Sequence, residues 1–218
     1  MFCGPEMRRA FLAALLGLAA TGPTAAAETT EVGALEAGVQ GSCPQTCLAV
    51  SRTTGYQAKV GPRRDVYVVP RDGRIVAWTL ALGNPGPRQT GFLNERLGGE
   101  ARAALVVLGP GARLRHRVVA KAPLRRLRRW FGRRVQFTLG ETLRVRRGQL
   151  LALSVPTWAP ALQVNRGADT SWRASRSPRA CEDTEGQTAL LGRRRVARFS
   201  CLYRTARLTY SATLVSTP

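Results

Sequence analysis

Apolar and polar residues alternate with a period of two along much of this chain. In 208–214, Leu208, Tyr210, Ala212 and Leu214 alternate with hydroxyl-bearing residues. Successive side chains of a strand point to opposite sides, so this pattern predicts a strand with one buried and one solvated face. Other segments with strand-like length and content are 65–69, 74–82, 103–108, 113–119, 133–139, 142–146 and 149–155.

Turn-forming residues separate these segments, as in Gly83-Asn-Pro-Gly-Pro87 and Gly109-Pro-Gly111. Short strands at this spacing, without a long helical pattern, predict an all-β fold, a single antiparallel β-sandwich of jelly-roll-like type. The stretch 83–99 is rich in glycine and proline, and we expect it to be a loop.

One segment departs from the strand pattern. Pro123 precedes and Gly132 follows the sequence Leu-Arg-Arg-Leu-Arg-Arg-Trp-Phe. Proline at the start and glycine after the end are typical of a helix. The apolar residues are spaced along one helical face and the arginines along the other. We therefore expect one short helix near 124–131.

The first 27 residues have the composition of a secretory signal peptide. Two arginines precede an apolar run, 10–20, that is too short to span a bilayer as a helix, and three consecutive alanines end at Ala27. We predict cleavage after Ala27 and a secreted, extracellular or cell-envelope-associated protein with no transmembrane segment after cleavage. The stretch 28–42 carries three glutamates and no basic residue. We expect it to be an acidic flexible leader before one β-sandwich domain, 43–218.

Four cysteines follow the signal segment, and an even number in an exported protein indicates disulfides. Among the three possible pairings, we predict Cys43–Cys47 and Cys181–Cys201. The alternative is a four-cysteine zinc site, but the spacing of these cysteines is a poor match to zinc sites.

Arginine dominates the charge of the chain. Lysine and arginine together number 34 against 13 acidic residues, a formal net charge of +21. Two explanations stay open: the codon usage of a GC-rich genome, which favours arginine over lysine, and attraction to polyanions. Local clustering favours the second, because thirteen basic residues and a single acid, Glu141, lie between Arg113 and Arg147.

Within this tract, 123–134 combines arginines with aromatic residues. The arginines of 113–117 and 144–146 fall on outward rows of two strands, as in any basic β-protein. Guanidinium groups bind phosphate and carboxylate groups, and aromatic rings add stacking or interfacial insertion. We therefore expect a basic face for polyanions (wall polymer, anionic lipid or acidic polysaccharide) and no specific nucleic acid, since no base-reading motif is present. The candidate anion-binding residues are Arg125, Arg126, Arg128, Arg129, Trp130, Arg133 and Arg134.

Strand-and-turn segments of the chain have a recurrent form: VPRDGRIVAW at 69–78, LGPG at 108–111 and LRVRRGQLLAL at 143–153. This pattern resembles the jelly-roll-like β-sandwich domains of secreted, uncharacterised actinobacterial proteins, over roughly 60–160 and, through CLYRTARLTY at 201–210, the last strand. The resemblance implies the fold and an extracellular address, and it carries over no catalytic residue.

Residues for catalysis or metal binding are scarce. The single histidine, His116, lies on an apolar strand face, so we expect it to be packed rather than to act as a base. One histidine excludes a His-based metal cluster. Glu182, Asp183 and Glu185 have the chemistry to ligate calcium, but we favour neutralisation of nearby arginines. We expect no enzymatic activity, no metal and no cofactor.

An alternative function rests on tryptophan. Exposed indoles beside polar side chains stack on sugar rings, so Trp158, Asp169, Trp172 and Arg173 are candidate carbohydrate-binding residues. The competing expectation is that both indoles fill the ends of the sandwich, and we expect Trp78 in the core. A third possibility is an inert structural envelope protein.

Overall fold

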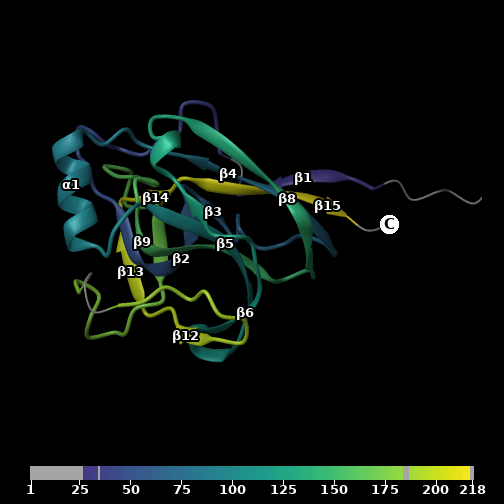
Figure 1. The fold of residues 1–218 in the computed structure, drawn as a ribbon. Coiled ribbons are helices and arrows are strands. Elements are labelled where there is room, and N and C mark those ends of the chain that lie inside the picture. The colour runs from purple at the N-terminus through teal and green to yellow at the C-terminus, as the bar shows by residue number, and fades with distance from the viewer. Residues whose placement is uncertain (1–26, 34, 184–186, 217–218) are drawn as a thin grey trace, which may run out of the picture.

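The computed structural model describes residues 27–33, 35–183 and 187–216, so the predicted signal peptide lies outside the described residues except for Ala27. Strand pairing in the described chain is antiparallel throughout. The strands form two main sheets with an apolar core between them (Figure 1). The fold is therefore all-β and sandwich-like, as the alternating pattern predicts.

The smaller main sheet has four strands. Their order is β1 (Thr29–Val32), β15 (Tyr210–Ser216), β4 (Gly73–Ala81) and β8 (Arg134–Val145).

The larger sheet is built around three central strands. Its order is β12 (Val196–Arg198), β6 (Arg115–Lys121), β5 (Arg102–Gly109), β9 (Leu150–Ala159), β2 (Val50–Val60), β11 (Ser171–Ala174) and β13 (Cys201–Arg204). The short strands are β3 (Arg63–Arg64) on β2, β7 (Arg125–Arg126) on β5, and the pair β10 (Leu162–Gln163) and β14 (Arg207–Leu208).

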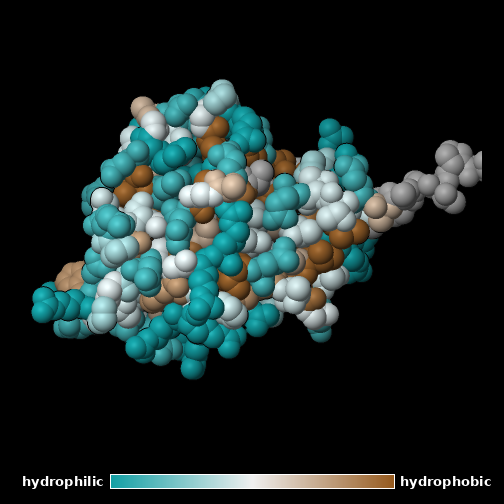
Figure 2. Space-filling model, turned by 90° about the horizontal axis from the view of Figure 1, so that it is seen from above, coloured by the Kyte–Doolittle hydropathy of each residue, from teal (hydrophilic) through white to brown (hydrophobic). Residues whose placement is uncertain are grey.

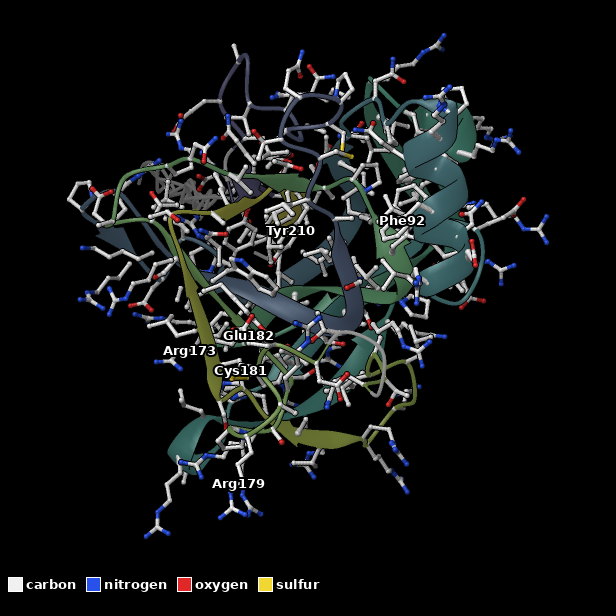
Figure 3. The ribbon with its side chains drawn as sticks, turned by 90° about the vertical axis from the view of Figure 1, so that its left-hand side faces the viewer. Phe92, Arg173, Arg179, Cys181, Glu182 and Tyr210 are labelled. Atoms are coloured by element: carbon white, nitrogen blue, oxygen red, sulfur yellow. A yellow bond between two sulfur atoms is a disulfide. The ribbon has the colours of Figure 1, made fainter. Side chains whose placement is uncertain are left out.

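The main core fills the space between the two sheets. Trp78 and Leu80 from β4 meet Leu105 and Leu153 from β5 and β9, and all four are fully buried. Tyr210 of β15 also lies in the interior (Figure 3). The predicted core position of Trp78 and the predicted buried face of the last strand are confirmed.

A second apolar cluster covers the outer face of the larger sheet. Side chains from β2, β5, β6 and β9 pack there against Leu190 and Phe199, which belong to the segment between β11 and β13. Backbone groups of Leu190 bond to buried hydroxyls of the sheet, with Thr54 at 2.8 Å and Ser154 at 3.0 Å. Both faces of β5 and β9 are therefore buried, which explains their nearly continuous apolar sequences.

The α-helix of the described chain lies where we expected a loop. α1 (Pro87–Arg96) has proline in its first turn, and the Gln89 side chain accepts a hydrogen bond from the Gly86 N–H at 2.8 Å. Leu93 and Leu97 pack it against the core. The loop prediction for 83–99 is therefore wrong, because these apolar contacts outweigh the local glycine and proline content.

The segment 124–131 forms β7 and a one-turn 3-10 helix, η2 (Arg128–Trp130), instead of one short helix over its whole length. The reason is competition for hydrogen bonds at the edge of β5. The Leu127 N–H donates to the Ala101 carbonyl at 3.0 Å, and β7 pairs with the start of β5. A second 3-10 turn, η1 (Ala112–Leu114), precedes β6.

The acidic leader, expected to be flexible over 28–42, contains the edge strand β1, and Val32 within it is buried. The Glu31 carboxylate accepts hydrogen bonds from the hydroxyls of Ser211 and Thr213. The expectation of a flexible leader is therefore wrong. β1 is held in the sheet because it pairs with β15 and because its Glu31 carboxylate accepts hydrogen bonds from β15 hydroxyls.

Arginines of the sandwich also bind the leader. Glu36 lies 3.1 Å from Arg63 and 3.7 Å from Arg207, whose side chain is 1% exposed. Arg134 donates to the backbone carbonyls of Leu35 and Glu36. Opposite charge thus adds to strand pairing in docking this segment.

Both predicted disulfides are present. The sulfurs of Cys43 and Cys47 are bonded across a sequence separation of 4, and those of Cys181 and Cys201 across a separation of 20. The second bond closes the segment that carries Leu190 and Phe199. It therefore holds the cover of the larger sheet in place.

Removal of the second disulfide is expected to destabilise the protein more than removal of the first. The chain-entropy argument gives about 3 kcal/mol for Cys181→Ala/Cys201→Ala and about 2 kcal/mol for Cys43→Ala/Cys47→Ala. Urea unfolding of the two double variants measures the difference directly. Equal losses, or a larger loss for the first pair, would contradict the assignment of the 181–201 bond as the main covalent restraint.

Candidate anion-binding groove

The predicted anion-binding segment is held at the edge of the larger sheet. Arg125 and Arg126 lie opposite Ala103 and Arg102 of β5, and the buried Leu127 fixes the chain after them. The turn of η2 then closes with the Trp130 N–H donating to the Leu127 carbonyl at 2.8 Å. One buried leucine and two backbone pairings thus present the flanking arginines to solvent.

These arginines line one open groove of about 700 Å³. Arg126, Arg128 and Arg129 are exposed, whereas Arg125 and Trp130 are half-buried. The lining residues are Glu100, Leu124, Arg125, Arg126, Arg128, Arg129, Trp130 and Phe137. The groove therefore combines four guanidinium groups with an apolar, aromatic base.

Aromatic rings hold two of the guanidinium groups in place. The Arg125 guanidinium lies 5.6 Å from the centroid of the Phe137 ring, and that of Arg129 lies 4.8 Å from Trp130. The rings of Trp130 and Phe137 meet edge-on with centroids 6.2 Å apart. Cation–π attraction of this kind orients a cation without neutralising it.

The positive charge of the groove is mostly uncompensated. Glu100 lies 3.9 Å from the Arg126 Nε, but both side chains are largely exposed, so the pair contributes little stability. The Nε of Arg125 and the Nε1 of Trp130 are buried and have no acceptor among the described residues. Four cations and one carboxylate leave a net charge of +3.

The structure brings together five of the seven predicted anion-binding residues, and Arg133 and Arg134 are not among those that line the groove. Arg134 is bonded to leader carbonyls, and Arg133 is exposed. The prediction missed Glu100, which precedes β5, and Phe137, which belongs to β8. Phe137 alternates with polar residues in β8, so its sequence indicates a buried position without indicating what lies above it.

The carbohydrate-binding prediction fails because both of its indoles are buried. The Nε1 of Trp158 donates to the Asn94 side chain at 2.9 Å and to the Gly99 carbonyl at 3.1 Å, which places it under α1. Trp172 faces the core, and its ring stacks on Tyr203 with centroids 4.5 Å apart. Neither ring is presented to a sugar, because both indoles are buried.

His116 is packed, as predicted. It is buried, its Nδ1 accepts a hydrogen bond from the Gly111 N–H at 3.4 Å, and its ring lies 5.1 Å from that of Phe199. Burial, and next the nearby Arg173 guanidinium, lower the pKa of His116 below its ordinary value. It is therefore a neutral core residue at physiological pH.

The described residues contain no group of three or more His, Cys, Asp or Glu side chains placed to hold a metal ion, and Glu185 lies outside them. In the same part of the chain, no helix has the length and apolar character needed to cross a membrane. Comparison of the chain with known protein families, with curated proteins and with solved structures found no match.

The single histidine allows a direct pH test. Because folding lowers the pKa of His116, the unfolded chain takes up a proton at a higher pH than the folded chain. The free energy of unfolding is therefore highest above pH 6.5, about the pKa of His116 in the unfolded chain. It falls as the pH drops below that value, by at most about 1.4 kcal/mol per pH unit. Urea unfolding at pH 7.5 and 5.5 should show this loss in the wild type and not in His116→Phe. The same slope in both proteins would show that another group titrates.

Proposed function

We propose that this protein is a secreted, non-catalytic binding protein that attaches to a polyanion through the groove of 124–130. The supporting observation is the convergence of Arg125, Arg126, Arg128 and Arg129 on one open depression with little acidic compensation. An inert basic surface does not require this convergence. The groove itself motivates the proposal more than the total charge of the chain does.

The form of the groove suits a flexible, repeatedly charged ligand. An open depression accepts a polymer or a layer of headgroups from the side, and several guanidinium groups contact successive phosphates, sulfates or carboxylates. Trp130 and Phe137 offer apolar contact to the carbon skeleton between those charges. Wall polymers, acidic polysaccharides and anionic lipid surfaces all present such a ligand.

Two disulfides support an address outside the reducing cytosol. The space outside the cell is also where anionic wall polymers, acidic polysaccharides and outer lipid surfaces occur. Secretion and polyanion binding are therefore consistent parts of one proposal.

The groove predicts salt-dependent retention on heparin. The affinity for heparin is expected to fall with rising salt concentration. Glutamine at Arg125, Arg126, Arg128 and Arg129 is expected to make the slope of log affinity against log salt concentration shallower by about 3. Elution of wild type and variant from immobilised heparin across a salt series measures this change. Arg126, Arg128 and Arg129 are exposed but Arg125 is half-buried, so urea unfolding of the variant checks that its fold is intact.

The matched control removes the same number of charges outside the groove. Arg113, Arg115, Arg144 and Arg146 are exposed and do not line it, so their replacement with glutamine is expected to leave retention near that of the wild type. An equal loss of heparin retention in both variants would show that net charge, and not the groove, causes the binding. Absence of retention in the wild type at low salt would favour an inert envelope protein.

A further inference from the structure

A second group of cations lies toward the opposite edge of the larger sheet from the groove. Its members stand at paired positions on β2, β3, β11 and β13. Lys59 of β2 is directly opposite Arg64 of β3 and also opposite Ser171 of β11, and Ser171 is opposite Arg204 of β13. Residues that are opposite each other in a sheet point to the same face. We call Lys59, Arg64, Ser171, Arg173 and Arg204 the cation row.

Strand alternation directs the cation row away from the core. Trp172 faces the main core, so Ser171 and Arg173 on either side of it face outward. Arg173, itself a residue of β11, lies at the periphery of the molecule (Figure 3). The five side chains line a small depression of about 210 Å³, together with Ala58, Ala168 and Leu202. The row is therefore a concave site and not only a charged strip.

Repulsion within the row is not relieved by the described chain. Like charges directly opposite each other in a sheet destabilise it, as at Lys59 and Arg64. No described carboxylate lies within 4.0 Å of these cations. Among the described residues, the only hydrogen bond of their charged groups joins the Arg173 guanidinium to the Phe199 carbonyl at 3.3 Å. The hydroxyl of Ser171, at the centre, has no hydrogen-bond partner among the described residues.

Acidic residues near the row do not cancel its charge. Asp169 follows Ala168 and lies beside the β2–β3 turn at Gly61, and Asp65 follows β3. Even if both carboxylates are counted, four cations leave a net charge of +2. The row therefore keeps a net positive charge that an anion would neutralise.

We propose that the cation row is a second binding site, specific for one tetrahedral oxyanion group, a phosphate or a sulfate. Three guanidinium groups and one ammonium group supply charged donors from several directions, and Ser171 supplies a hydroxyl donor at the centre. The volume accommodates one such group with an attached sugar ring and is too small for a run of polymer. The site is separate from the groove, because the two share no residue.

The first experiment uses inorganic phosphate as the probe. Line broadening of its ³¹P resonance, at constant ionic strength set with sodium chloride, is expected to saturate with the wild-type protein. Arg64→Gln/Arg204→Gln removes two exposed cations and is expected to weaken binding by about tenfold or more, since a hydrogen bond to a charged group contributes about 1.5 kcal/mol or more. The matched control, Arg144→Gln/Arg146→Gln, has the same charge and is expected to bind as the wild type does.

A built-in carboxylate gives an independent readout. Leu202 is exposed, lines the depression and lies opposite Arg173, so Leu202→Glu places an anion among the cations. This variant is expected to lose phosphate binding and to gain thermal stability at low salt, because the carboxylate relieves the repulsion. A merely structural role for the row would not produce both effects.

The source of the oxyanion is resolved by competition. Displacement of phosphate by glucose 6-phosphate or glucose 6-sulfate at lower concentration than by free phosphate or sulfate indicates an ester group on a sugar, whereas equal displacement indicates the free ion. Absence of saturable broadening in the wild type would overturn the proposal, as would equal loss in the control. The variant with glutamine at Arg125, Arg126, Arg128 and Arg129 is expected to bind phosphate as the wild type does. The Arg64→Gln/Arg204→Gln variant is expected to keep its binding to heparin, so failure of one site can be distinguished from failure of the other.

Discussion

Burial of the central strands on both faces is the constraint on which the rest of this structure depends. β5, β9 and β2 contact the main core on one side and the cluster around Phe199 on the other. Charged side chains are excluded from such strands, because an unpaired charge in an apolar interior is strongly unfavourable. Arginine is accordingly rare in these three strands, where it occurs only as Arg52 near the start of β2 and Arg102 at the start of β5. Cations close in space are thus a result of the fold as well as of the composition.

The arginines that do enter the interior are bonded differently from those at the edges. Arg176 is buried and donates to the carbonyls of Ser51 and Cys181 and to the hydroxyl of Tyr203. Arg207 is buried near the leader carboxylate of Glu36. These side chains stabilise connections between segments. Among the described residues, the side chains of Arg128 and Arg129 in the groove and of Arg64 and Arg204 in the cation row have no such hydrogen-bond or carboxylate partner, and they are the ones available to a ligand.

The sequence pattern was sufficient for features that are determined by residues close together in the chain. Alternation identified β4, β5, β6, β8, β9 and β15 and the orientation of His116, and cysteine count with spacing identified both disulfides. The predicted strand 65–69 is wrong, because this segment forms only an isolated bridge at Val68, and the central strand β2 was not predicted. The sequence pattern was insufficient where a distant partner decides. β1 is polar and acidic and becomes a strand only because β15 pairs with it. The segment 124–131 has helical spacing but bonds to the edge of β5.

The candidate sites show the same division between local and distant determinants. The sequence identified the arginines of the groove because they are adjacent in the chain. It did not identify the cation row, whose members come from four strands and become neighbours only through the sheet register. Alternation around Trp172 was a usable signal, since an inward indole requires that Ser171 and Arg173 point outward.

The position of β15 has a consequence for how the protein reaches its native state. This strand is late in the sequence, yet it lies between β1 and β4 in the four-stranded sheet (Figure 1). Until residues 210–216 have been synthesised, β1 has no neighbour and β4 has one unpaired edge. Hydrophilic residues dominate one face of the finished molecule, with apolar ones showing between them (Figure 2), but an incomplete chain exposes the interior of its sheet. Such high contact order predicts slow folding that is completed only after translation has passed the last strand.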